Sequence, residues 1–153
     1  MSDDRGFKAE PDPANPGWHS WLPNDPSRFN SWMFSQMLVR AEPDGKARLR
    51  VFPTHHHTNL ANNIHGGTVL ALIDIGLFAC SRMLGIIEAG TAVTIDLSVQ
   101  FVGAGKAGLP CDAVTELLKE TRRLVFLRGV IEQGEGGLIA AYSGTIRKPT
   151  APK

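Results

Sequence analysis

A sixteen-residue apolar segment, residues 66–81, constrains the fold of this chain more than any other feature. It reads GGTVLALIDIGLFACS, and Asp74 is its only acidic or basic residue. A segment this short, interrupted by a carboxylate, does not comfortably span a bilayer. We expect residues 64–84 to form one long helix, apolar on nearly every side and central to the protein. A sheet with one face in water cannot bury such a helix, so the sheet must curl around it.

The rest of the body alternates between predicted strands and turns. Strands are expected at residues 34–41 and 46–52 around a hairpin turn at 42–45, followed by a polar loop at 55–63. The clearest strand is residues 91–101, in which apolar and polar side chains alternate. Further strands are expected at residues 111–120, 124–133 and 138–147, with a glycine-rich turn at 134–137. Two strands, a buried helix and then antiparallel strands form an α+β pattern.

Residues 1–31 differ in composition from the rest of the chain. They contain half of the prolines, together with Trp18 and Trp21. We expect the first dozen residues to be loose and a short helix to begin at residues 25–27. The tryptophan-bearing part is expected to dock on the body as structural cover, although it could also line the substrate site. This divides the chain into a partly disordered extension (1–31), one domain (32–149) and a tail (150–153).

Composition argues against several classes of function. The formal net charge of +1 is unlike that of proteins that bind nucleic acid through bulk charge. No secretory signal precedes the body, and Cys80 and Cys111 form neither a disulfide framework nor a metal motif, so a reducing cytoplasm is expected. The three consecutive histidines at 55–57 cannot all point the same way, which favours a polar loop over a metal site. We expect no metal, cofactor or membrane partner.

Asp74 is the first candidate for chemistry. Its helical neighbours three and four positions away are all apolar: Leu70, Ala71, Leu77 and Phe78. We therefore expect Asp74 to be buried, and aspartate is rarely buried without a partner or a task. The helix also begins on two glycines, which offer free N–H groups and the positive end of the helix dipole to an anion. An anion site and a carboxylate on one helix indicate hydrolysis of an acyl compound.

These motifs resemble those of a known family. Asn59, the HGG motif at 65–67, Asp74, the strand AVTIDLSVQF and the closing GLIAAYSGTIRK are similar to hotdog-fold acyl-CoA thioesterases of the phenylacetate-degradation (PaaI-like) type. The resemblance covers residues 34–148. It implies a curved antiparallel sheet around a central helix, assembly into homodimers or homotetramers, and active sites at the subunit interface. The segment VGAGKAGLP departs from the turn that shapes the coenzyme A region in relatives.

By position, the resemblance also implies roles for individual residues. Asp74 corresponds to the catalytic nucleophile or general base, and the Gly66 N–H to the donor that polarises the thioester carbonyl. Asn59 matches the position that orients the attacking water or the thioester. His65 matches the motif histidine, and Thr94 a small hydroxyl near the carboxylate.

Each of these residues also has a structural interpretation. Asp74 could be a structural acid and Asn59 a turn former, while His65 could simply begin the helix. The glycines at 66 and 67 could allow close helix–sheet packing, although Gly67 is also a candidate substrate-binding residue. Thr94 lies on an alternating strand, where a structural role is equally compatible with the pattern.

Basic residues at the predicted turn 121–123 are the remaining binding candidates. Arg122 and Arg123 lie near Lys119 and Arg128 in the sequence, and such a cluster could hold the phosphates of coenzyme A. A solvated turn explains the same residues.

The spacing within the helix predicts a dimer if Gly66 and Asp74 act together. They are eight residues apart, so at about 1.5 Å per residue they are separated by roughly 12 Å along the axis. One carbonyl cannot contact both within one subunit. Gly66 of one chain must then face Asp74 of another, in a symmetric dimer with two equivalent sites.

The expected activity is hydrolysis of an acyl-CoA thioester to a carboxylic acid and free coenzyme A. Two alternatives stay open: a dehydratase or hydratase of the same fold, and a protein that binds acyl-CoA without catalysis. The absence of an Asp-x-x-x-x-His motif counts against the dehydratase. The sequence does not specify the acyl group, nor does it distinguish a dimer from a tetramer.

Overall fold

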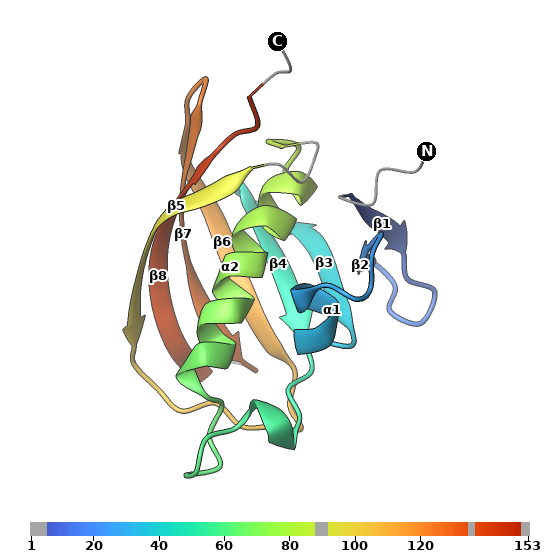
Figure 1. Cartoon of the computed structure of the whole chain (residues 1–153), viewed down its shortest axis with the longest axis vertical. Coiled ribbons are helices and arrows are strands. Elements are labelled where there is room, and N and C mark those ends of the chain that lie inside the picture. Colours follow the sequence, from blue (N-terminus) through green and yellow to red (C-terminus); the bar gives the residue numbers. More distant parts are fainter. Residues whose placement is uncertain (1–5, 88–91, 135–136, 151–153) are drawn as a thin grey trace.

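The computed structural model describes residues 6–87, 92–134 and 137–150. Within these ranges the chain forms one eight-stranded antiparallel sheet in the order β1-β2-β3-β4-β6-β7-β8-β5. The long helix α2 (Gly66–Met83) lies against the concave face of the sheet, and the short helix α1 (Phe29–Met33) lies beside it (Figure 1). The predicted α+β architecture, a curved antiparallel sheet around a central helix, is confirmed.

Most strands of the body begin and end where the sequence pattern places them. The observed strands are β3 (Met37–Glu42), β4 (Lys46–Val51), β5 (Val93–Phe101), β6 (Cys111–Glu120), β7 (Leu124–Gln133) and β8 (Gly137–Arg147). The first starts three residues later than expected, and the polar loop contains a short 3-10 helix, η1 (His55–His57). The predicted strand start at Thr91 and the middle of the turn at 134–137 lie outside the described residues.

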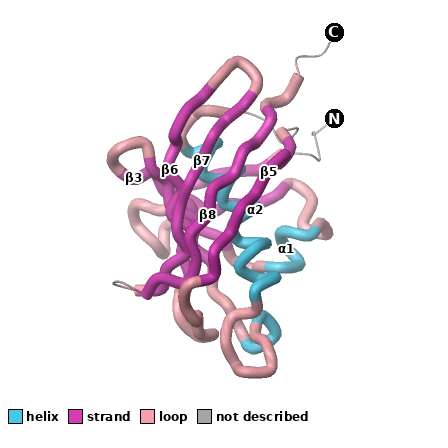
Figure 2. Tube along the Cα trace, turned by 90° about the vertical axis from the view of Figure 1, so that its left-hand side faces the viewer, coloured by secondary structure: helices cyan, strands magenta, loops and turns pink. Residues whose placement is uncertain are grey.

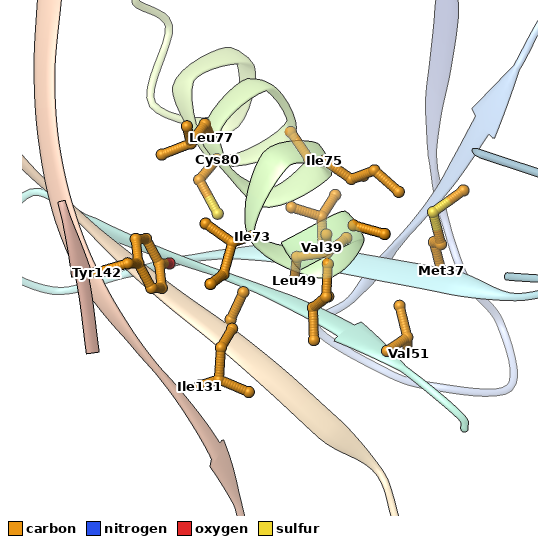
Figure 3. Close-up of a cluster of buried hydrophobic side chains, with 14 of the residues drawn as sticks. Met37, Val39, Leu49, Val51, Ile73, Ile75, Leu77, Cys80, Ile131 and Tyr142 are labelled. Carbon is orange, nitrogen blue, oxygen red and sulfur yellow. The ribbon is translucent and has the colours of Figure 1, made fainter. Parts of the chain in front are cut away.

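The hydrophobic core lies between α2 and the sheet. Figure 3 shows Ile73 and Cys80 of the helix directed toward Ile131 and Tyr142 of the sheet. Leu77 packs where Gly144 has no side chain, since a Cβ built on Gly144 would lie 2.8 Å from the Leu77 Cδ1 atom. These contacts fix one face of α2 firmly against the strands.

The opposite face of α2 is open, which corrects one prediction. Leu70 and Asp74 are exposed, and Phe78 is only partly buried, so a stripe along the helix is not covered by the sheet. The expectation that Asp74 is buried is wrong for the single chain, because the sheet curves around only part of the helix circumference. The apolar composition of α2 would suit a membrane span, yet 61% of the helix is buried inside the protein, as in a core helix.

The N-terminal extension is more ordered than its composition suggests. Residues 7–11, expected to be loose, form strand β1 (Phe7–Pro11), which pairs with β2 (His19–Pro23) and so extends the sheet beyond β3. The predicted docking of the tryptophans is confirmed, because Trp21 is 1% exposed. The Trp18 ring contacts two guanidinium groups, with Arg40 at 4.4 Å and Arg50 at 4.7 Å from the ring centroid.

Helix α1 begins at Phe29, later than the predicted start at residues 25–27. Asp25 accepts hydrogen bonds from the backbone N–H and the hydroxyl of Ser27, which close a turn before the helix. The outermost residues of the predicted extension and tail, 1–5 and 151–153, lie outside the described residues.

The two edges of the sheet carry different side chains. At one edge, β1 ends on a proline and exposes Lys8 and Glu10. At the other, β5 lies at the edge of the sheet and pairs only with β8 among the described strands (Figure 2). It exposes apolar side chains, including Ile95 and Phe101. Charge and proline at an edge discourage pairing with another chain, whereas an apolar edge permits it.

Candidate active site

Asp74 lies in the middle of the open stripe of α2, where strand β5 passes beside the helix. The Thr94 hydroxyl of β5 donates a hydrogen bond of 2.7 Å to Asp74 Oδ1. The second carboxylate oxygen, Oδ2, bonds to no other residue in the described part of the chain. The structure therefore brings together two of the predicted site residues and leaves one carboxylate oxygen available to a ligand.

A pocket of about 210 Å³ opens beside Asp74. Its walls come from three parts of the chain: the N-terminal extension, the second half of α2 and the segment that follows α2. Most lining side chains are apolar, and they include Phe7, Trp21, Ile75, Phe78 and Ile87. The polar lining groups besides Asp74 are Asn30 and Arg82. A carboxylate in the lining of a largely apolar pocket is a common arrangement in ligand sites.

The start of α2 is built by His65, Gly66 and Gly67. His65 is the N-cap, and its Nδ1 atom accepts a hydrogen bond of 2.8 Å from the Gly67 N–H. That bond occupies the Gly67 donor. The Gly66 N–H, in contrast, has no acceptor among the described residues, and it lies at the positive end of the helix dipole. Of the two glycines, Gly66 is thus the one able to polarise a carbonyl oxygen.

Gly66 lines a second pocket, of about 290 Å³, on the β5 side of the helix start. Asn59 and Phe101 line the same pocket, so the structure brings Asn59 and Gly66 together. The Asn59 side chain also shapes its own loop, because its Oδ1 atom accepts hydrogen bonds from the Ala61 and Asn63 N–H groups. The amide NH₂ of Asn59 makes no hydrogen bond to a described residue.

The two pockets divide the predicted site into halves. Asp74 and Thr94 belong to the first half, and Gly66 and Asn59 to the second; no pocket described in the chain contains both Asp74 and Gly66. This agrees with the separation of roughly 12 Å expected along the helix. Within one chain the two groups do not meet on a single carbonyl.

The histidine run serves the fold locally. His57 is buried, its Nδ1 accepts from the Thr54 N–H at 2.8 Å, and its Nε2 lies 2.6 Å from the Met33 carbonyl oxygen. Its ring stacks on Phe34. Among the described residues, no group of three or more histidine, cysteine or acidic side chains has the arrangement of a metal site.

The two cysteines are also unsuited to nucleophilic chemistry. Both are buried, and burial raises the pKa of the Cys80 thiol and that of the Cys111 thiol to about 12. A thiol becomes a nucleophile only as the thiolate, which burial disfavours. Asp74 is left as the candidate nucleophile or base beside the first pocket.

Arg122 and Arg123 lie on the exposed turn between β6 and β7. Neither lines the pocket of Asp74 or that of Gly66. Nearby, Arg128 pairs with Glu116 at 2.9 Å. Within one chain, this turn is therefore not part of either half of the site.

Sequence reasoning missed several lining residues. Phe7, Asn30 and Arg82 escaped notice because no motif marks them. Trp21 was noticed as an aromatic residue expected to dock, with lining of the substrate site as the alternative. Gly103 and Ala104, which line the Gly66 pocket, lie in the segment VGAGKAGLP that departs from the family pattern.

Comparison with solved structures finds the same fold in several bacterial proteins. The TT0310 protein from Thermus thermophilus is 25% identical, with a TM-score of 0.62, 74% of this chain covered and 92% of that one. The E. coli PaaI protein from the phenylacetic acid degradation operon is 18% identical, with a TM-score of 0.61 and coverage of 71% and 80%. A hypothetical thioesterase from Streptococcus pneumoniae TIGR4, solved with coenzyme A, is 21% identical, with a TM-score of 0.64 and coverage of 76% and 88%.

No curated protein matches the chain in sequence. The family model described as the thioesterase superfamily matches residues 61–140, which include the start of α2, Asp74, the whole of β5 and most of the sheet that follows. This match spans more than half of the chain and agrees with the predicted resemblance. The chain therefore belongs to the thioesterase superfamily and has its hotdog fold.

Proposed function

We propose that this protein is an acyl-CoA thioesterase that uses Asp74 as its nucleophile or general base. The observation that carries the proposal is the Asp74 carboxylate on the open stripe of α2, held by Thr94 at 2.7 Å beside a largely apolar pocket. Two structural neighbours support coenzyme A thioesters as substrates: one was solved with coenzyme A, and another, from Streptococcus mutans UA159, bound to acetyl CoA.

The chemistry requires one carboxylate and one oxyanion donor. Asp74 takes a proton from water as the water oxygen attacks the thioester carbonyl carbon, or it attacks that carbon directly to form an anhydride that water then hydrolyses. The carbonyl oxygen gains negative charge, which the Gly66 N–H stabilises by about 3 kcal/mol. The C–S bond breaks, and the coenzyme A thiolate leaves and takes up a proton. Oxygen-18 incorporation into the enzyme during one turnover separates the two routes.

The proposed site is shared between two copies of this chain. Asp74 and Gly66 line separate pockets, so the donor for one Asp74 is the partner subunit's Gly66. The β5 edge is the surface proposed to meet the second copy, because its outer side is unpaired among the described strands and Ile95 is 53% exposed. Leu70, on the same open side of α2, would be covered by such a partner.

Release of free thiol from a panel of acyl-CoA esters tests the proposal. The panel comprises acetyl, hexanoyl, palmitoyl, benzoyl and phenylacetyl esters. Asp74→Asn should lower kcat by about 10²-fold to 10⁴-fold, while the variant stays folded and keeps its oligomeric state. Asp44→Asn is the matched control, because Asp44 is an exposed carboxylate in the turn between β3 and β4. Equal activity in the two variants would contradict the role of Asp74.

A further inference from the structure

The pocket beside Asp74 has a wall that the thioesterase family match does not include. Two aromatic side chains that line it, Phe7 and Trp21, come from the N-terminal hairpin formed by β1 and β2. The family model begins at residue 61, and the hairpin precedes it. This wall therefore comes from a part of the chain outside the family match.

We infer that the N-terminal hairpin closes the acyl-binding pocket of this enzyme and limits it to short and medium acyl groups. This inference rests on the proposed function, because it assigns the pocket beside Asp74 to the acyl part of the thioester. The lining supports that assignment, since Ile75, Phe78 and Ile87 suit a hydrocarbon better than the charged phosphates of coenzyme A.

The aromatic wall is held firmly in place. The Phe7 ring stacks on Trp21 with centroids 4.7 Å apart, and Trp21 is 1% exposed. β1 and β2 pair along their whole length, from Phe7 opposite Pro23 to Pro11 opposite His19. The cation–π contacts of Trp18 with Arg40 and Arg50 fix the hairpin to the outer face of the sheet. An acyl chain cannot displace this wall without separating several contacts at once.

The size of the pocket matches a compact acyl group. Its volume of about 210 Å³ is below the roughly 300–1,000 Å³ of pockets that hold drug-sized ligands, which indicates an acyl group shorter than a palmitoyl chain. The wall is built within one chain, because Phe7 and Trp21 stack on each other and both line the pocket. The hairpin therefore sets one limit on how far the acyl chain extends, whether or not a second copy pairs with β5.

The test compares chain-length preference in variants of the wall, using saturated acyl-CoA esters from butanoyl to palmitoyl. Phe7→Ala should raise kcat/KM for long esters relative to butanoyl by about tenfold or more, because the pocket gains room for several methylene groups. Phe7→Trp should lower kcat/KM for long esters relative to butanoyl. Leu22→Ala is the matched control: Leu22 is on β2 and 46% exposed, does not line the pocket, and should leave the preference unchanged.

A binding readout keeps this test separate from the test of catalysis. Dissociation constants of non-hydrolysable thioether analogues of the same lengths are measured by calorimetry, together with thermal unfolding of each variant. If Phe7→Ala does not fold, Phe7→Leu takes its place as a smaller truncation. The inference is overturned if the wild type accepts palmitoyl as well as hexanoyl, or if the Phe7 variants bind and hydrolyse each length like Leu22→Ala. Loss of activity in Asp74→Asn bears only on the proposed function.

Discussion

On the face of α2 that meets the sheet, Ile73, Leu77 and Cys80 are fully buried, whereas Leu70 and Asp74 on the opposite face are exposed. Both faces are rich in apolar residues, yet only one of them contributes to the core of this chain. The two faces of one helix therefore have different roles: the buried face stabilises the fold, and the open face carries the candidate catalytic residue. Substitutions on the buried face should change the free energy of unfolding, and substitutions on the open face should change assembly and catalysis.

The largest effect on stability is expected from the buried face. Leu77→Ala should lower the free energy of unfolding by about 3 kcal/mol, because it leaves a cavity where Leu77 packs against Gly144. Urea titration followed by circular dichroism measures this change. Asp74→Asn, on the open face, should change the urea concentration at the unfolding midpoint very little. Equal destabilisation by the two variants would contradict the division of roles between the two faces of α2.

Assembly should depend on the apolar edge beside the open face. Ile95→Lys places a charge on β5, where Ile95 is 53% exposed and lies at an irregularity in the pairing with β8. We expect the dimer to dissociate in sedimentation experiments at micromolar concentration, with thiol release falling in parallel. Leu118→Lys, which changes another exposed apolar side chain on β6, is the control. A dimer that persists in Ile95→Lys would show that the dimer interface does not include β5.

The hydrogen bond to Asp74 should have an intermediate effect on catalysis. Thr94→Ala removes the hydroxyl that donates to Asp74 Oδ1, and a hydrogen bond to a charged group contributes about 1.5–3 kcal/mol. We expect kcat to fall by about tenfold or more, with little change in KM. Thr94→Ser retains the hydroxyl and should retain most of the activity. Equal losses in the two variants would show that the methyl group, not the hydroxyl, matters at this position.

The smallest effect is expected from the turn that belongs to neither face of α2. Replacing Arg122 and Arg123 together by glutamate should raise KM for acyl-CoA a few-fold with little change in kcat, if these side chains attract the phosphates of coenzyme A. Steady-state kinetics at low and high salt measure the difference, which should shrink as salt increases. An unchanged KM at low salt would show that Arg122 and Arg123 do not bind the substrate, and that the pockets along α2 bind it without them.

Much of the sheet could be predicted because its signals are local. Strands β6 and β7 flank a short polar turn at residues 121–123, and their observed bounds coincide with the predicted ones. The start of α2 was also recognisable, since glycines at a helix N-terminus have a direct physical meaning.

The N-terminal strands could not be predicted because their pairing depends on distant partners. The segments FKAEP and HSWLP are only five residues long, and each ends in proline, which strands disfavour. What orders them is the stacking of Phe7 on Trp21 and the contacts of Trp18 with two arginines from β3 and β4. No short-range pattern encodes which surface an aromatic side chain will meet.

The exposure of Asp74 could not be predicted from the sequence for a related reason. Apolar neighbours three and four positions away define a stripe, but they do not say whether strands of the same chain or another molecule cover it. Gly66 and Asp74 could be chosen from the sequence, whereas their division between two pockets required the structure.

The hairpin of β1 and β2 meets the rest of the sheet through only two backbone partners, His19 opposite Val39 and Ser20 opposite Leu38. Its backbone attachment is therefore small, and the buried Trp21 and the contacts of Trp18 with Arg40 and Arg50 supply the rest. For protein engineering, a grafted hairpin that keeps both tryptophans would alter the pocket without any change to the helix. The place of the hairpin also recommends the C-terminus for affinity tags, because a bulky tag before Phe7 would sit next to the wall of the pocket.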